Sequence, residues 1–287
     1  MDAPPELTDL RPSPIAGMWY PGAAGQLAAE IDRYLAEADA AAPVTAPSLG
    51  AIIGVMAPHA GYRYSGPVAA HAFRLVRGMA VETVAVVSPI HRPVSRAPVF
   101  TTAHQAYMTP LGPVRVDHAA IEAVRAAANV SIEATRHDQE HALEIELPFL
   151  QRVLDGDFAL TPLMLSDQSA HTAERVGRAL AKALHGRRAL LVASTDLSHF
   201  YDQRTANHLD SVVLDRVAAF DPEGVIAVED EGRGFACGRG AVAAVMWAAR
   251  DLGADAAEVV NYATSGDTSG DYTRVVGYGA AVFYKRG

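Results

Sequence analysis

The stretch GAIIGVMAPHAGYRYSG, residues 50–66, combines the signals that decide the fold. An apolar run over residues 50–57 stops at Pro58, and His59 and Gly61 follow at once. A short apolar run bounded by turn signals is typical of a strand buried inside a parallel sheet. We therefore expect a strand that delivers His59 to the carboxyl end of a sheet, where Gly61 lets the chain turn away.

Further segments of the same kind alternate with helical patterns along the chain. Buried parallel strands are predicted over residues 81–88, 158–165, 188–195, 257–264 and 275–284. Helices are predicted over residues 65–78 (with Ser65 as the N-cap), 117–129, 139–154, 169–186, 205–220 and 240–253. Residues 97–117 instead predict an extended, hairpin-like segment with a turn at TPLGP.

The alternation of strands and helices predicts the fold class α/β. We expect a single-domain sandwich over residues 1–287, with a mostly parallel central sheet flanked by helices. Residues 1–14 are rich in proline and are expected to form an extended N-terminal arm over the surface.

Composition excludes several functional classes. The net charge of −9 and the lack of a basic face argue against nucleic acid as a partner. No apolar run is long enough to span a bilayer, and the first residues lack the pattern of a signal peptide, so no membrane role is expected. The single cysteine excludes an intrachain disulfide, and a cytoplasmic protein is the expectation.

Polar side chains follow three of the predicted strands. His59 and His91 each come directly after a strand, and Asp196 and His199 follow residues 188–195. Ligands of open α/β sheets bind beyond the carboxyl ends of the strands, so these residues are candidates for one site. A histidine with a nearby carboxylate can act as a general acid or base, although Asp196 is also a candidate helix N-cap. For the remaining histidines we expect surface or packing roles: His71, His104, His118, His137, His171, His185 and His208.

Cys237 lies just before a predicted helix, where amide N–H groups favour the thiolate. A thiolate binds iron, copper or zinc well, and two histidines with one anionic ligand are typical of redox and catalytic metal sites. The alternative is that Cys237 is a small buried residue beneath a glycine turn.

His141 and Glu144 stand three residues apart in a predicted helix, so both can face the same way. One interpretation is a metal-binding pair of the kind found in helix bundles. The other, which we favour, is that Glu140 and His141 open the helix, that His141 lies near the site without binding the metal, and that Glu144 orients a ligand histidine.

Eight segments in this order resemble a known family. They are AGMWYPG, APHAGYRYSGPVAAHAF, SPIHR, TPLGPVRVD, EHALEIELPFLQ, STDLSHF, CGRGAV and SGDTSGDYTRVVGYGAAVFY. From about Arg11 to the C-terminus the chain resembles the Memo family, also described as AmmeMemoRadiSam system protein B. The resemblance implies a fold similar to that of the class III extradiol dioxygenases, which hold non-haem iron.

The resemblance also implies roles for individual residues. His59, His91 and Cys237 match the family's metal ligands, with iron or copper as the expected ion and zinc as an alternative. His199 matches the acid/base histidine of the dioxygenases, with Asp196 beside it. Around them, the second shell or pocket is expected to include His141, Glu144, Tyr62 and Trp19.

Three functions follow as hypotheses. The first is a metal-dependent oxidoreductase, in the manner of a dioxygenase, acting on a small aromatic molecule. The second is a non-enzymatic protein that holds a metal or a peptide in a vestigial dioxygenase cleft. The third gives the polar residues a purely structural role. By resemblance, a radical-SAM protein and an AMMECR-like protein are the expected functional partners.

Overall fold

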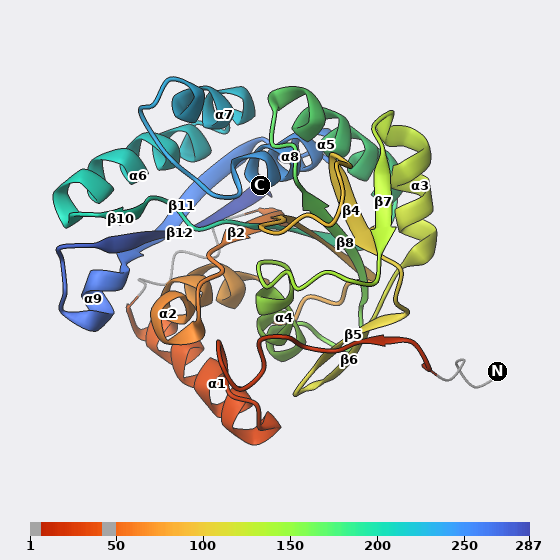
Figure 1. Cartoon of the computed structure of the whole chain (residues 1–287), viewed down its shortest axis with the longest axis horizontal. Helices are drawn as coiled ribbons and strands as arrows, with labels where there is room; N and C mark the ends of the chain where they lie inside the picture. The colour runs from red at the N-terminus through yellow and green to blue at the C-terminus, as the bar shows by residue number, and fades with distance from the viewer. Residues whose placement is uncertain (1–6, 42–49) are drawn as a thin grey trace.

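The computed structural model describes residues 7–41 and 50–287, and its centre is a nine-stranded sheet (Figure 1). The strands are β2 (Ala51–Ala57), β3 (Thr83–Pro89), β4 (Val99–Thr102), β7 (Ile132–Thr135), β8 (Ala159–Leu165), β9 (Ala189–Ser194), β10 (His199–Tyr201), β11 (Ala256–Thr264) and β12 (Val275–Lys285). Their order is β10-β12-β2-β9-β3-β8-β4-β7, and β11 also pairs with β12. β2, β9 and β3, the three strands with polar residues at their ends, are therefore neighbours.

The direction of pairing differs between the middle and one side of this sheet. β2, β9, β3 and β8 pair in parallel, as predicted. β11 and β12 pair antiparallel, and β12 is also antiparallel to β2, so the prediction of parallel strands was wrong for this pair. Only residues 265–274 connect β11 to β12, fewer than the dozen or so that a parallel crossover needs.

Helices cover both faces of the sheet, which confirms the predicted α/β sandwich (Figure 1). One face is covered by α1 (Ala24–Ala41), α2 (Tyr62–Phe73) and α4 (Leu147–Val153). The other is covered by α3 (His118–Ala128), α5 (Ala170–Leu184), α6 (Gln203–Ala218), α7 (Pro222–Asp230) and α8 (Arg239–Asp251). Alternate residues of β3 divide between the two cores, because successive side chains of a strand point to opposite faces: Val84 and Val86 to one, Ala85 and Val87 to the other.

Two helix predictions were wrong in detail. α2 begins at Tyr62 with Gly61 as N-cap, and the Ser65 hydroxyl donates instead to the carbonyl oxygen of Ala60 at 2.6 Å. The helix predicted over residues 139–154 is regular only in its second half. A loop leads to the short 3-10 helix η3 (Glu144–Glu146), and α4 follows directly. This loop carries His141 and is held by side-chain contacts described below.

The N-terminal segment is tied to the body of the protein. β1 (Leu10–Arg11) pairs in parallel with β5 (Ala106–Thr109), which forms the predicted hairpin with β6 (Gly112–Arg115). Arg11 is buried, with 2% of its surface exposed. Residues 1–6 of the expected arm lie outside the described residues.

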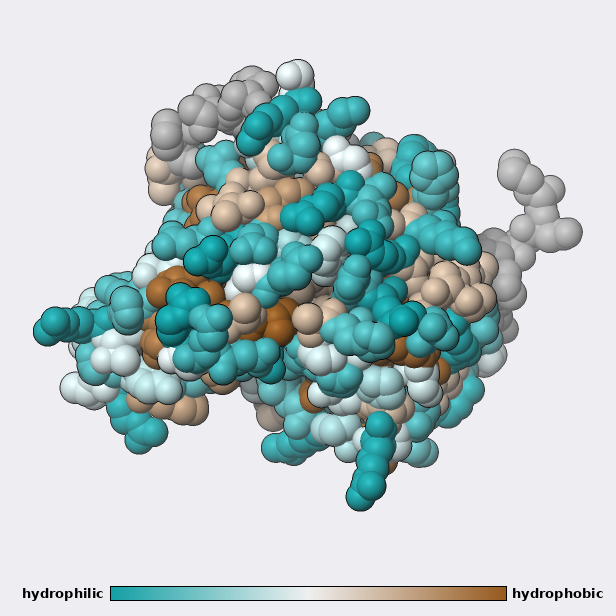
Figure 2. Space-filling view, turned by 90° about the horizontal axis from the view of Figure 1, so that it is seen from above, coloured by the Kyte–Doolittle hydropathy of each residue, from teal (hydrophilic) through white to brown (hydrophobic). Residues whose placement is uncertain are grey.

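The outer surface is mostly hydrophilic on the face that Figure 2 shows, where hydrophobic residues form small, separate groups. In the described part of the chain, no helix combines the length and the apolar character that crossing a membrane requires.

Candidate metal centre

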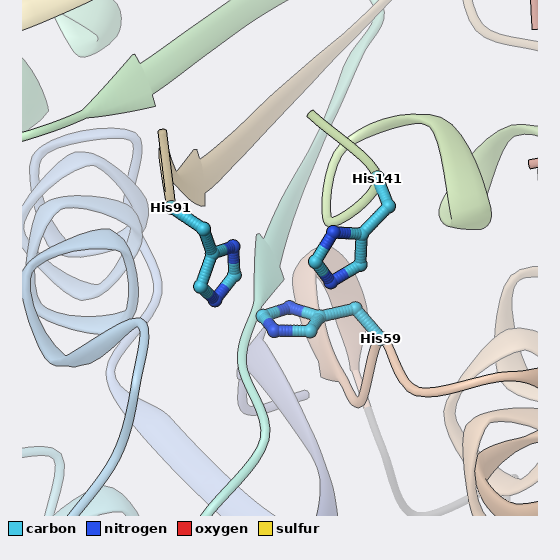
Figure 3. A group of neighbouring side chains, drawn as sticks. All are labelled: His59, His91 and His141. Atoms are coloured by element: carbon cyan, nitrogen blue, oxygen red, sulfur yellow. The ribbon is translucent and has the colours of Figure 1, made fainter. Parts of the chain in front are cut away.

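Three histidine side chains converge beyond the carboxyl ends of the central strands (Figure 3). His59 follows β2, His91 follows β3, and His141 belongs to the loop before η3. Each ring offers one nitrogen, and the three nitrogens lie within 4.8 Å of one another. The neighbouring positions of β2, β9 and β3 explain why the first two histidines meet. The loop that carries His141 adds the third.

His59 is enclosed by protein and fixed at both its backbone and its ring. Its backbone N–H donates to Asp196 Oδ1 at 2.7 Å, and its Nδ1 atom lies 2.9 Å from Ser194 Oγ. Burial lowers the pKa of His59 well below its usual range, and the nearby His141 and His91 lower it further. His59 is therefore neutral at neutral pH, which is the form of imidazole that binds a metal.

One carboxylate, that of Glu140, holds the other two histidines. Its Oε1 atom lies 3.0 Å from His91 Nδ1 and 3.3 Å from His141 Nδ1. Glu140 also accepts the backbone N–H groups of His91 at 2.5 Å, His141 at 2.9 Å and Ala142 at 2.9 Å. Burial opposes ionisation of Glu140, but the hydrogen bond from His91, the nearby imidazoles and these backbone donors lower its pKa to about 2. The Glu140 carboxylate is thus charged, and both of its oxygens accept hydrogen bonds.

The imidazole rings and one indole pack on one another. His91 and His141 are stacked, with ring centroids 4.8 Å apart and 20° between the planes. The Trp19 ring packs on His141, with ring centroids 4.2 Å apart, and His59 stands edge-on to His91 and His141. Burial lowers the pKa of His141 to about 4, whereas the hydrogen bond to Glu140 raises the pKa of His91 against the effect of burial.

Cys237, the third ligand expected from the sequence, lies against His59. Its Sγ atom is 3.1 Å from His59 Nε2, and the backbone N–H of Asp196 donates to Sγ at 3.2 Å. Burial raises the pKa of the thiol well above its usual range, and the negative charge of Asp196 adds to this, so the protein without metal holds a neutral thiol. The group of three that can share one ion contains His141 instead of Cys237. A ligand role for Cys237 stays a prediction.

A cavity of about 470 Å³ opens beside the histidines. Besides His59, His91 and His141, its lining includes Met18, Trp19, Tyr64, Asp196, His199 and Tyr278. Burial raises the pKa of Asp196 to about 7, although its carboxylate accepts the N–H groups of His59 and Ala60. His199 Nδ1 donates to the carbonyl oxygen of Leu197 at 2.7 Å, which leaves its Nε2 atom unprotonated in the neutral ring. The two predicted acid/base residues thus share one cavity with the histidine cluster.

Comparison with known proteins identifies the family. A family model described as Memo-like protein matches residues 11–282. The chain belongs to the Memo-like family. A MEMO1 family protein from Nitrosopumilus maritimus is 36% identical over 275 residues, covering 96% of this chain and 99% of the relative. One from Methanopyrus kandleri is 37% identical over 281 residues (95% and 98%), and one from Methanothermobacter thermautotrophicus is 41% identical over 243 residues (82% and 87%).

Trp19 and Tyr62, two of the residues expected around the metal in this Memo-like protein, lie in different places. Trp19 contacts the His141 ring and lines the cavity. Tyr62 is buried and donates its hydroxyl to the carbonyl oxygen of Ile145 at 2.8 Å, while Tyr64 lines the cavity. Tyr62 therefore supports the fold beneath the site.

The prediction that Glu144 orients a ligand histidine was wrong. Glu144 Oε2 pairs with Arg11 Nη1 at 2.5 Å, and its other oxygen accepts from Ser13 and from Tyr20, the latter at 2.7 Å. The prediction assumed helical spacing from His141 to Glu144, but His141 lies in a loop and the two side chains point to different partners.

Two residues that hold the histidines of this Memo-like protein were not singled out for that role. Glu140 orients His91 and His141, and Ser194 contacts His59. Glu140 directly precedes His141, and Ser194 ends β9 two residues before Asp196, so both lie beside residues that the sequence does mark. Their partners are 49 and 135 positions away, and no local pattern reveals such contacts.

Proposed function

We propose that this Memo-like protein binds a metal ion through His59, His91 and His141, and that the ion is redox-active iron or copper. One observation carries the metal-binding part. The Nδ1 atom of every ring faces a protein partner, Ser194 for His59 and Glu140 for the other two. The Nε2 atoms are then left as ligands, an arrangement in which outer partners fix the tautomer and the direction of metal-binding imidazoles.

The geometry fits one small cation after a slight approach of the rings. Metal–nitrogen bonds are about 2.1 Å long, so two nitrogens on one ion are at most about 4.2 Å apart. The nitrogens here lie within 4.8 Å of one another, and the His91 and His141 side chains are 36% and 20% exposed, which gives them room to rotate. The neutral state of His59 and His141 removes the repulsion that charged rings would exert on a cation.

The nature of the donors supports iron or copper. Imidazole suits iron, copper and zinc, while a thiolate adds preference for softer ions. Sγ of Cys237, 3.1 Å from His59 Nε2, is within the separation expected for two donors on one ion, since metal–sulfur bonds are about 2.3 Å long. Bound iron or copper would supply one-electron chemistry or O2 chemistry at the cavity wall. Zinc, which has no redox chemistry, is the alternative.

The cavity supports a dioxygenase-like oxidoreductase with a small-molecule substrate. Its volume of about 470 Å³ suits a small organic ligand, and Trp19, Tyr64 and Tyr278 offer aromatic surface to an aromatic ring. His199, with its Nδ1 proton held by Leu197, is the group we propose to accept a proton at Nε2 from a bound substrate.

The exposed rim favours a second candidate, a non-enzymatic protein that holds a metal or a peptide in the same cavity. Met18 is 74% exposed and Tyr64 is 36% exposed, and both line the opening. Exposed apolar side chains at a cleft are typical of sites that receive a partner.

Metal titration followed by a turnover assay tests the proposal. Metal-free protein is titrated with Zn²⁺, Cu²⁺ and, without oxygen, Fe²⁺, and His59→Ala, His91→Ala and His141→Ala are each expected to abolish tight binding. His208→Ala, on the exposed side of α6, is the matched control and should bind like the unchanged protein. Unchanged affinity in the three cluster variants would refute the site.

A turnover assay with metal-loaded protein then distinguishes the oxidoreductase from the non-enzymatic protein. Protein with Fe²⁺ or copper is mixed with a panel of catechols and other small phenols and then with O2. Oxidised product that disappears in His199→Ala supports the oxidoreductase. Tight metal binding without product across the panel favours the non-enzymatic protein.

A further inference from the structure

The hydroxyl group of Ser194 is the centre of a buried polar cluster beneath the histidines. Its Oγ atom lies 2.9 Å from His59 Nδ1, 2.6 Å from the carbonyl oxygen of Ala142 and 2.7 Å from Glu146 Oε1. Ser194 has no exposed surface, and His59 and Glu146 are each 1% exposed. Because solvent does not reach these atoms, their hydrogen bonds have to be satisfied among themselves.

The number of protons available decides the direction of each hydrogen bond. A serine hydroxyl donates one hydrogen bond and accepts two. The carbonyl oxygen of Ala142 can only accept, so Ser194 donates to it. Ser194 Oγ then has to accept at its two remaining contacts, from Nδ1–H of His59 and from a protonated carboxyl group of Glu146. An ionised Glu146 would compete with Ala142 for the single serine proton and leave one buried acceptor without a donor, which costs about 1–3 kcal/mol or more for a charged group.

The surroundings of Glu146 agree with this assignment. Burial raises the pKa of Glu146 well above its usual range, the contact with Ser194 opposes this, and the negative charge of Asp196 adds to it. No cation forms an ion pair with Glu146 among the described residues, whereas Glu140 binds the donors of two histidines. Burial therefore favours the neutral acid at Glu146, whereas the surrounding donors favour the carboxylate at Glu140.

We infer that Glu146 is a positioning residue, a neutral carboxylic acid that acts through Ser194 to keep the proton of His59 on Nδ1 and its lone pair on Nε2. The consequence for metal binding rests on the function proposed above. The same hydroxyl bonds the carbonyl of Ala142, the residue after His141, so Ser194 also joins the segments that carry two of the proposed ligands. Nε2 of His59 is thereby presented to the ion without a proton to displace.

The first test observes protonation directly in metal-free protein at neutral pH. ¹⁵N NMR of the imidazoles is expected to show His59 protonated at Nδ1 and bare at Nε2, with His59→Ala identifying the signals. An infrared difference between the unchanged protein and Glu146→Gln should contain the carbonyl band of a protonated carboxyl group. Glu146→Gln replaces the acid O–H donor by an amide N–H donor and should leave the His59 tautomer unchanged, whereas Ser194→Ala should shift protons onto Nε2.

The second test uses Zn²⁺ alone, by competition with a coloured chelator. Glu146→Gln should bind within about twofold of the unchanged protein, and Ser194→Ala about 10–100-fold more weakly. Thermal unfolding without metal confirms that both variants are folded. A missing carboxyl band, or an equal loss of affinity in both variants, overturns the inference. Absence of Zn²⁺ binding in the unchanged protein would instead refute the proposed function, while the NMR and infrared results would still decide the protonation states.

Discussion

The Nε2 atom of His59 lies 3.1 Å from the Sγ atom of Cys237, although 178 positions separate the two residues in sequence. His59 follows β2, and Cys237 lies two residues before the start of α8. This Nε2 atom is the one that we propose as a metal ligand, and burial keeps the facing thiol neutral by raising its pKa. An ion bound at Nε2 would replace this contact, and the thiol would then either bind the ion as thiolate or lose His59 as a partner.

Cys237→Ser distinguishes a site of three histidines from one of two histidines and a thiolate. We expect this variant to keep Zn²⁺ binding within about 10-fold, because three imidazoles remain, and to lose more affinity for Cu⁺, which prefers sulfur. Protein loaded with Cu²⁺ should show a sulfur-to-copper charge-transfer band, and the Cys237→Ser variant should lack it. If His141→Ala binds Cu⁺ normally and Cys237→Ser does not, the ligand set is the one expected from the sequence. Identical spectra for Cys237→Ser and the unchanged protein would remove Cys237 from the ligands.

Much of the fold could be predicted because the central strands carry strong local signals. β2, β3, β8 and β9 are continuous apolar runs between turn residues, which is how strands buried on both faces read. The direction of strand pairing was harder to predict, because an apolar run does not indicate which way a strand runs in the sheet. Only the short connection before β12 indicates that β11 and β12 pair antiparallel. Neither α1 nor α7 was predicted.

The candidate site was predictable only where the backbone alone decides the position of a side chain. His59 and His91 lie two residues after β2 and β3, which pair in parallel with the two edges of β9, so the topology places both histidines at the same end of the sheet. The position of His141 depends on a loop held by Glu140 and by Arg11, which donates to the Glu140 carbonyl oxygen at 2.7 Å. Such contacts form between distant segments, and helical periodicity suggested a different direction for this side chain.

Glu140→Gln should weaken metal binding by about 10–100-fold, the usual effect of removing a partner that orients metal ligands. The amide keeps the size of the side chain but removes the charge that holds His91 and His141. Zn²⁺ competition with a chelator measures the effect. Glu223→Gln, on the exposed side of α7, is the matched control. A Zn²⁺ affinity within twofold of that of the control would show that His91 and His141 keep their orientation without the Glu140 carboxylate.

The stability that Glu140 contributes should disappear in acid. Its pKa falls from 4.5 to about 2 on folding, so its contribution is complete above the unfolded value and is lost as pH falls through that range. At about 1.4 kcal/mol per pKa unit the contribution is about 3 kcal/mol in order of magnitude. Urea unfolding of metal-free protein and of Glu140→Gln should give a difference in free energy that shrinks between pH 5 and pH 2. A difference independent of pH would contradict this.

Arg11→Met should destabilise the protein by about 3–5 kcal/mol, because it leaves buried carboxylates without their cation. Arg11 pairs with Asp138 at 2.7 Å and with Glu144 at 2.5 Å, and all three side chains are at most 3% exposed. Arg33→Met is the control, since its partner Glu37 lies on the surface of α1 and such pairs contribute about 0–1 kcal/mol. Equal urea midpoints for the two variants would show that the buried pairs do not hold the N-terminal segment.

Gly177→Ala should destabilise the protein because α5 and α8 touch at this glycine. A Cβ atom there would lie 2.4 Å from the carbonyl oxygen of Ala244 and 2.6 Å from Cβ of Trp247, so two packed helices would have to separate. Overpacking of this kind costs typically 1–3 kcal/mol, and it outweighs the gain of up to about 1 kcal/mol that alanine brings to a helix. Gly25→Ala in α1, where a Cβ meets no atom within 4 Å, should not destabilise. Urea unfolding compares the two variants, and a stabilising Gly177→Ala would mean that the contact between α5 and α8 is loose enough to take a methyl group.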